Sequence, residues 1–202
     1  MEDNIIEQIE YRNYTIKIVY DDSPWNPRED DNLGTIFAPA SQGGHKYGLN
    51  ESEIQTIEEF SAHVKKYKTI YLPLYIYDHS GITFNTTGFS CPWDSWQIGF
   101  IYIDKEKARK ELGWKIITKN RIKKLYSYLR REVEEFDNYC TGNCCGYIIE
   151  YNGEQIESCY SFLGDEGQKY AISESKAIID NIIKNRDIQL NLFEIPKELR
   201  LA

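Results

Sequence analysis

Apolar residues recur in the pattern of β-strands in three stretches of the chain, residues 11–20, 69–77 and 96–103. In the first stretch the alternation of apolar and polar side chains is regular, which predicts a half-buried strand. Pro73 lies inside the second stretch and lacks a backbone N–H donor, so we expect it at a sheet edge or a bulge.

Two further strand-like runs, residues 147–151 and 155–162, flank the dipeptide Asn152-Gly153. Asparagine and glycine both accept positive φ angles, which a type I′ turn requires at its two central positions. The three segments together predict a β-hairpin.

Apolar residues at three- and four-residue steps predict helices. The longest begins at Thr118 and ends near Tyr139. Asn50 is the expected N-cap of the first helix, and Asp104 is the expected N-cap of a short basic helix that stops at Gly113. A last helix is expected over residues 168–185.

Strands and helices follow one another without a regular strand–helix–strand rhythm. This order favours an α+β fold, with a mostly antiparallel sheet and about three to four helices packed on it. The length of 202 residues suits a single domain over residues 1–202. Residues 21–50 would form a long loop, and residues 186–202 an apolar tail that either docks or is mobile.

The composition indicates a substantial core, because 41% of the residues are hydrophobic and 14% are aromatic. No run of 18 apolar residues occurs, so neither a transmembrane helix nor a membrane partner is expected. The acidic first residues lack a signal-peptide pattern, which favours a cytoplasmic protein. The five cysteines are odd in number and irregularly spaced, which indicates free thiols in a reducing compartment.

Charge is distributed unevenly along the chain, whose net charge is −8. Residues 105–131 hold 11 Lys and Arg against two acidic residues, so this basic segment carries +9. The other residues hold 13 basic and 30 acidic groups and carry −17. A separation of this size can steer and orient a charged partner.

Residues 78–103 combine a histidine, a cysteine, two tryptophans and three phenylalanines with a polar loop. The chain resembles a family of bacteriophage and prophage accessory proteins in the segments DHSGIT (78–83), FSCPWDSWQIGF (89–100), Tyr20-Asp21, Pro27-Arg28-Glu29 and Asp31-Asn32-Leu33-Gly34-Thr35. The resemblance implies a mobile-element origin, the cytoplasm of a bacterial host and a fixed loop around residues 27–35. It implies no particular reaction.

Catalytic chemistry is a second interpretation of residues 78–103. His79 has the side chain of a general base, and Asp78 or Asp94 would orient it. Cys91 or Ser80 would then be the nucleophile. No known nucleophile motif surrounds these residues, and turn-forming and packing roles explain the same side chains. We therefore assign no catalytic residue and keep, as an alternative, a small hydrolase-like enzyme with the candidates Asp78, His79, Cys91 and Asp94.

Metal binding is not expected. A structural zinc site prefers two closely spaced pairs of ligands, and Cys140-x3-Cys144 supplies one pair without a second. Cys159 falls within an expected strand. The acidic loop that starts at Asp21 lacks the spacing of an EF-hand. The sequence therefore predicts neither a metal nor another cofactor.

The basic segment 105–131 offers nucleic-acid binding as another alternative. Its aromatic residues Trp114 and Tyr126 would stack on bases. No motif for sequence readout is present, and a solvated basic face explains the same pattern. The candidate residues of this alternative are Lys115, Lys119, Arg121, Lys123, Lys124 and Arg130.

The acidic charge and the resemblance to phage proteins together favour a protein that binds a host protein or nucleoprotein complex. We expect an inhibitor of a bacterial defence system, of the anti-CRISPR or antirestriction type, whose acidic surface partly mimics nucleic acid. Aromatic anchors would supply most of the affinity. The expected contact residues are Trp25, Glu29, Asp30, Asp31, Trp93, Asp94 and Trp96.

Overall fold

The computed structural model describes residues 4–194, with side chains up to residue 186. This part of the chain holds five α-helices and two antiparallel sheets of four strands each, which confirms the α+β class. The chain divides into two compact units. Unit 1 comprises Met1–Trp25 and Gly142–Ala202, and unit 2 comprises Asn26–Thr141.

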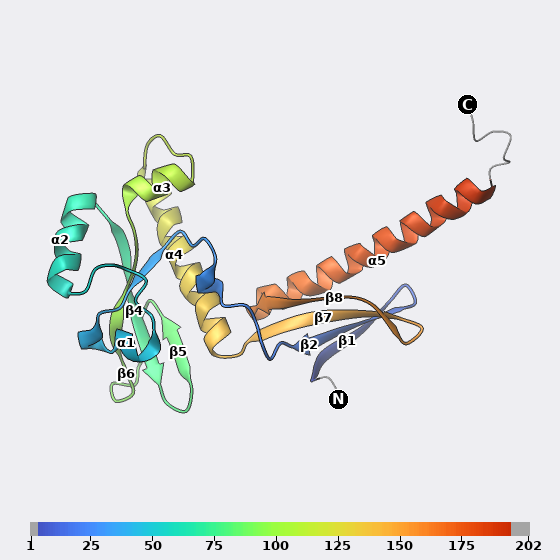
Figure 1. Ribbon diagram of the computed structural model, residues 1–202, viewed down its shortest axis with the longest axis horizontal. Helices are drawn as coiled ribbons and strands as arrows, with labels where there is room; N and C mark the ends of the chain where they lie inside the picture. Colours follow the sequence, from blue (N-terminus) through green and yellow to red (C-terminus); the bar gives the residue numbers. More distant parts are fainter. Residues whose placement is uncertain (1–3, 195–202) are drawn as a thin grey trace. The chain divides into compact units, whose positions relative to one another are not determined.

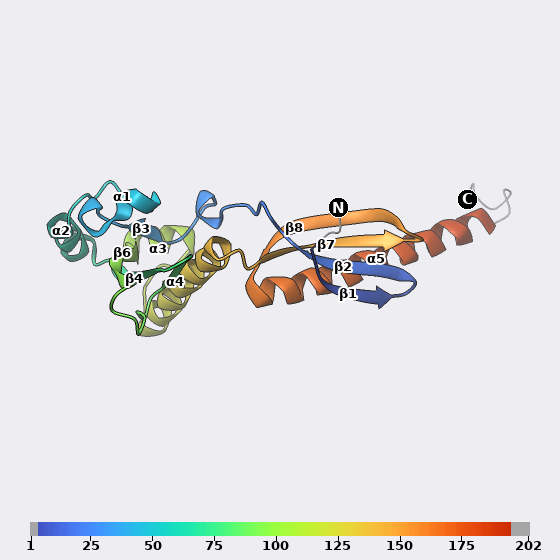
Figure 2. The same ribbon diagram turned by 90° about the horizontal axis from the view of Figure 1, so that it is seen from below.

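The sheet of unit 1 pairs an N-terminal hairpin with a C-terminal one, in the order β1-β2-β7-β8. Its strands are β1 (Ile5–Tyr11), β2 (Tyr14–Tyr20), β7 (Cys144–Tyr151) and β8 (Glu154–Leu163). The long helix α5 (Gly164–Glu194) runs along one face of this sheet (Figure 1). Figure 2 shows the same layering from below.

Both hairpins of unit 1 turn through two residues with positive φ. Asn152 and Gly153 have φ angles of 51° and 82°, so the predicted hairpin is confirmed. Arg12 and Asn13 have φ angles of 51° and 65° in the first hairpin. Strand β1 was not predicted, because the apolar residues of its sequence IIEQIEY do not alternate with the polar ones; its pairing with β2 also shifts register between Ile5 and Glu7.

The core of unit 1 lies between its sheet and α5. Ile16, Ile18 and Ile149 are fully buried on the sheet face, opposite Ala171 and Ile179 of the helix. Helix α5 begins before and ends after the predicted range 168–185. The predicted tail over 186–202 therefore overlaps this helix up to residue 194, and residues 195–202 lie outside the described residues.

The sheet of unit 2 has the order β3-β6-β4-β5. Its strands are β3 (Thr35–Phe37), β4 (Ile70–Asp78), β5 (Ile82–Asn85) and β6 (Ser95–Ile103). Strands β4 and β6 confirm two sequence predictions. Pro73 pairs only with β6, beside a register shift between Leu74 and Tyr75, as expected for proline at a local edge and bulge.

The predicted loop 21–50 contains secondary structure of its own. It includes β3, the 3-10 helices η1 (Pro27–Glu29) and η2 (Ala40–Gln42), and the short helix α1 (Gly44–Tyr47). Ile36 and Phe37 are buried in β3, so the loop is anchored to the sheet of unit 2.

Three longer helices complete unit 2: α2 (Ile57–Tyr67), α3 (Lys105–Glu111) and α4 (Lys119–Cys140). Helix α4 begins after the N-cap Thr118, as predicted, and buries Leu125, Leu129 and Val133 against the sheet. It packs across β4 and β5 and lies next to η1. It is therefore the element that joins the sheet to the loop at residues 26–34.

Of the two predicted helix caps, Asn50 was wrong and Asp104 is confirmed in position. Thr56 and Glu59 form the capping box of α2, whereas the Asn50 side chain accepts a hydrogen bond from the backbone of Ala38. Asp104 does hold the N-cap position of α3, but its carboxylate binds His63 instead of the helix. In both cases the polar side chain found a partner outside the helix.

Within residues 4–194, no helix combines the length and apolar character needed to cross a membrane.

Candidate functional site

Two of the segments quoted for the resemblance meet at one end of the unit 2 sheet. The backbone N–H of Asp78, at the end of β4, donates to the carbonyl oxygen of Asp94 at 2.9 Å. The hydroxyl of Ser95 donates to the carbonyl of Cys91, which closes the loop before β6. The loop that carries residues 86–94 is therefore tied to the sheet at its end.

Three of the four catalytic candidates lie together here. The Oδ2 atom of Asp94 lies 3.4 Å from Nδ1 of His79 and accepts a hydrogen bond from the Cys91 thiol at 3.6 Å. A single carboxylate oxygen thus bridges the imidazole and the thiol. His79 is largely exposed, so this cluster is at the surface.

Asp78, the fourth candidate, is turned to a different cluster. Its Oδ2 atom accepts hydrogen bonds from the Tyr47 hydroxyl at 2.6 Å and from Lys46 Nζ at 2.9 Å. The hydrogen bonds to Tyr47 and to Asp78 raise the pKa of Lys46 to about 12. The bonds from Tyr47 and Lys46 lower the pKa of Asp78. Asp78 is therefore an ionised partner of Lys46 and does not orient His79.

The tryptophans of this region differ in their surroundings. Trp93 is 90% exposed in the loop before β6, two residues ahead of Ser95. Trp96 donates from Nε1 to the Gln42 carbonyl at 3.0 Å, and its ring packs beside Tyr47 and the core. Trp93 is thus available to a partner, whereas Trp96 is mostly a structural residue. Trp25 is 57% exposed and belongs to unit 1.

The loop at residues 26–34 is held by a buried arginine, which sequence reasoning did not single out. Arg28 pairs with Glu51 and Glu132, and its side chain is 7% exposed. Burial by itself would lower the pKa of Arg28, but the hydrogen bonds and charges of the two carboxylates raise it overall. Glu132 also accepts hydrogen bonds from the backbone N–H groups of Leu33 and Gly34, each at 3.0 Å. These contacts hold the loop against α4.

The three acidic contact candidates in this loop, Glu29, Asp30 and Asp31, are exposed. They lie at the far end of β6 from Trp93, because Thr35 of β3 pairs with Tyr102, whereas Trp93 precedes Ser95. Seven residues of strand separate these two ends, roughly 23 Å at about 3.3 Å per residue. The predicted contact residues of unit 2 therefore form two surfaces and not one.

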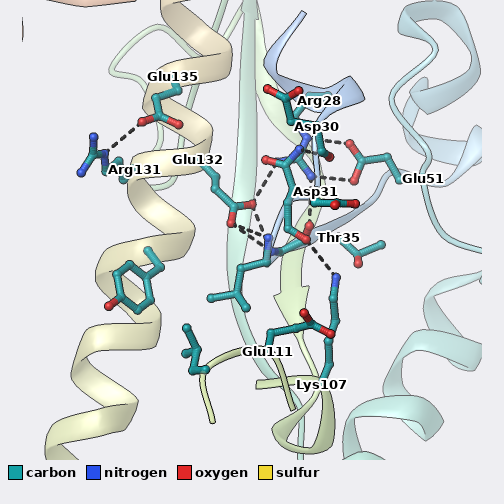
Figure 3. A pocket seen from close by; sticks show the side chains of 15 residues that line it. Arg28, Asp30, Asp31, Thr35, Glu51, Lys107, Glu111, Arg131, Glu132 and Glu135 are labelled. Atoms are coloured by element: carbon teal, nitrogen blue, oxygen red, sulfur yellow. Dashed lines mark hydrogen bonds and ion pairs between the residues drawn. The ribbon is translucent and has the colours of Figure 1, made fainter. Parts of the chain in front are cut away.

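A pocket of about 890 Å³ opens between the 30–35 loop, α3 and α4 (Figure 3). Its walls carry both signs of charge. Lys107 donates to the carbonyl of Asn32 at 3.1 Å, and Arg131 pairs with Glu135. Among the residues that the structure describes, no three His, Cys, Asp or Glu side chains are grouped so that they could hold a metal ion.

The six nucleic-acid candidates occupy the α3–α4 connection and α4 as far as Arg130. Arg121 donates to the carbonyl of Ile116 at 2.6 Å and lies over the ring of Trp114 at 4.9 Å. The other five are exposed: Lys115, Lys119, Lys123, Lys124 and Arg130. Trp114 and Tyr126 pack partly against the core, so the expected base stacking has little free ring surface.

Comparison of the chain with models of protein families, with curated proteins and with solved structures finds no match.

Proposed function

We propose that this chain acts by binding a protein and that the indole of Trp93 is the central anchor of the interface. The observation that carries the proposal is the 90% exposure of Trp93 on a loop that is tied to the sheet. An exposed aromatic side chain on an ordered loop loses little conformational entropy when a partner binds. Almost all of its apolar surface is then removed from water, which stabilises the complex. Such residues commonly contribute 2 kcal/mol or more, by order of magnitude, to a protein interface.

The loop around Trp93 supports this role through its order. Cys91, Asp94 and Ser95 all make hydrogen bonds within residues 78–95, so the loop has a defined shape before a partner arrives. Preorganisation reduces the entropy that binding would otherwise cost. His79 and Asp94 add charged and polar groups at the rim of the proposed interface.

A bacterial defence protein or nucleoprotein complex is the target that we propose, acting in the host cytoplasm. The resemblance to bacteriophage accessory proteins supports this choice. Unit 1 holds 16 Asp and Glu against 8 Lys and Arg, so its net charge is −8, whereas unit 2 has 16 of each kind. An acidic unit complements the basic groove of an enzyme that handles nucleic acid, and it would speed the encounter.

The exposed acids Glu29, Asp30 and Asp31 have a lesser part in the proposal. Because they lie near the other end of β6 from the Trp93 loop, they would act through their charge on the approach of the partner and not within the same anchor. Trp25 of unit 1 remains a candidate for a second contact.

Phage infection of strains that each carry one defence system tests the inhibitor function. Expression of the wild-type chain should raise plaque numbers on the strain with the target system, and Trp93→Ala should abolish the increase. Ile116→Ala, which removes a 67% exposed apolar side chain elsewhere in unit 2, should retain it. Equal plaque numbers with and without the chain on every strain would contradict inhibition.

A small hydrolase-like enzyme is the second candidate function, and the shared contact of His79 and Cys91 with Asp94 favours it. Attack by Cys91 would require Asp94 to take the thiol proton, since Asp94 is the group that contacts the thiol. An activated ester such as p-nitrophenyl acetate tests this chemistry. Turnover that is lost in both Cys91→Ser and Asp94→Asn would support it, whereas equal turnover in the variants would end it.

A further inference from the structure

Twenty consecutive residues of unit 2, Leu112–Arg131, contain seven basic side chains and no carboxylate. They form the α3–α4 connection and the first 13 of the 22 residues of α4. The nearest acids along the chain are Glu111 on one side and Glu132 on the other, and Glu132 is occupied by Arg28 and the backbone. Acidic residues that are close in sequence therefore do not neutralise these basic side chains, and the surface that they form is strongly positive.

The position of these charges works against the helix that bears them. The N-terminus of a helix carries a partial positive charge, so acidic residues stabilise the first turn and basic residues oppose it. The first turn of α4 has no acid and begins with Lys119, followed by Arg121 and Lys123. A charge pattern that lowers the stability of its own helix is expected where the charge has a function.

Five of the seven cations have no hydrogen-bond or ion-pair partner among the described residues: Lys115, Lys119, Lys123, Lys124 and Arg130. Arg121 and Arg131 do have partners, in Ile116 and Glu135. The five remaining side chains are exposed and free to meet an anion.

Three of the free cations also form a line. Lys119, Lys123 and Arg130 fall within an arc of about 40° on the surface of α4, at about 100° per residue. The line is about 16 Å long, which matches about five phosphates of one nucleic-acid strand at about 3.4 Å each. Lys124 lies about 100° further round α4 than Lys123, and Lys115 lies in the α3–α4 connection before the helix, so both extend the positive surface beyond this line.

The aromatic residues of the segment argue for contact with phosphates and not with bases. Arg121 covers Trp114 at 4.9 Å from its ring centroid, and both Trp114 and Tyr126 pack against the core. Because these rings are covered, bases cannot stack on them, and the surface can bind nucleic acid only through its charge. Charge contacts of this kind carry no sequence information.

We propose that the surface formed by Lys115, Lys119, Lys123, Lys124 and Arg130 binds the phosphate backbone of nucleic acid without regard to sequence. This inference is independent of the Trp93 interface, which lies beyond the opposite end of β6 from α3. If both hold, the chain has separate surfaces for the protein and the nucleic acid of a nucleoprotein target.

Fluorescence anisotropy with the full chain and labelled oligonucleotides of random sequence tests the proposal. With five phosphate contacts, the log–log slope of affinity against salt should be about −4.5 for duplex DNA and about −3.5 for a single strand. The variant Lys119→Gln/Lys123→Gln/Arg130→Gln should reduce the duplex slope to about −2 and weaken binding at low salt.

A matched variant controls for net charge. Lys65→Gln/Lys66→Gln/Lys184→Gln removes three exposed cations elsewhere and should leave the slope unchanged. Lack of binding at low salt would overturn the proposal. Displacement of the oligonucleotide by polyglutamate as effectively as by unlabelled DNA would overturn it as well, because the surface would then not prefer nucleic acid over an acidic polypeptide.

Discussion

Arg28 and Glu51 form a bidentate ion pair in unit 2, in which Nε and Nη2 of the guanidinium each lie 2.7 Å from a carboxylate oxygen. The remaining N–H groups of Arg28 donate to Asn32, Glu132 and the carbonyl of Gly34. All five donors are therefore used, on a side chain that is 7% exposed. Through these hydrogen bonds, Arg28 fixes the loop at residues 27–35 to α4 and to the start of β3.

Arg28→Met should destabilise unit 2 by about 3 to about 5 kcal/mol, because it leaves the partly buried carboxylates of Glu51 and Glu132 without their cation. Arg28→Lys should lie between this variant and the wild type, since lysine restores the charge but not the planar fork. Urea unfolding followed by tryptophan fluorescence measures the change, because three of the four tryptophans belong to unit 2.

The exposed pair of Arg131 and Glu135 provides the control for this prediction. Arg131 is 77% exposed, so Arg131→Met should change the free energy of unfolding by less than about 0.5 kcal/mol. Equal effects of Arg28→Met and Arg131→Met would show that the Arg28 network does not hold the loop.

Gly34→Ala should destabilise unit 2 by about 1 to about 3 kcal/mol, because the added Cβ has no room. It would stand 2.7 Å from Cδ2 of Leu129 and 2.8 Å from Oε2 of Glu132. Gly81→Ala is the matched control, since its Cβ would meet nothing within 4 Å. That variant should be neutral or slightly stabilising. Thermal unfolding of the two variants and the wild type measures the difference. A Gly34→Ala variant as stable as the wild type would contradict the close packing at this position.

Alkaline pH should weaken unit 1 through its buried thiols. Burial, and to a lesser degree the charge of Asp21, raises the pKa of both Cys144 and Cys145 to about 11 from the ordinary 9.0. A raised pKa favours the folded state below the unfolded value, and this contribution is lost as the pH rises from about 9 to about 11. The melting temperature should therefore fall across this interval.

The double variant Cys144→Ala/Cys145→Ala tests that prediction by circular dichroism. It should lose less stability between pH 9 and pH 11 than the wild type, whatever its stability at neutral pH. Cys159→Ala, which removes an exposed thiol, should follow the wild-type pH profile. A double variant with an unchanged alkaline slope would assign the fall to other groups, such as Tyr147, whose pKa burial raises to about 12.

The parts of the fold that were predictable from the sequence are those with regular periodicity. Helix α4 shows its buried stripe at three- and four-residue steps, and the β7–β8 hairpin has Asn152-Gly153 at its turn. Strands β3 and β5 have three and four residues, too few for a pattern, and they exist through pairing with β6 and β4. Their formation depends on tertiary contacts.

The candidate site was predictable only in its residue types. Trp93 and Trp96 stand three positions apart in one polar segment, yet one is 90% exposed and the other is bonded to Gln42. Arg28 looked like a loop residue, because its partner Glu132 is 104 positions away in sequence. Exposure and long-range pairing depend on the folded arrangement, which a single sequence does not display.

Trp93→Ala should leave the fold intact, because a side chain in water makes few contacts to lose. The free energy of unfolding should change by less than about 0.5 kcal/mol. Trp96→Ala should cost clearly more, since it removes packing against Tyr47 and the core. Comparison of the two variants by urea unfolding separates the proposed binding residue from the structural one.

The most direct test of the Trp93 interface is quantitative affinity capture from lysates of bacteria that carry defence systems, with nuclease present. The tagged wild-type chain should retain a protein partner in stoichiometric amount. With the tagged chain kept below the wild-type Kd, Trp93→Ala should lose about 95% of it, since about 2 kcal/mol corresponds to about a 30-fold weaker complex, and Ile116→Ala should retain it. Undiminished capture by Trp93→Ala, or a wild-type chain that retains no protein from any such lysate, would contradict the account.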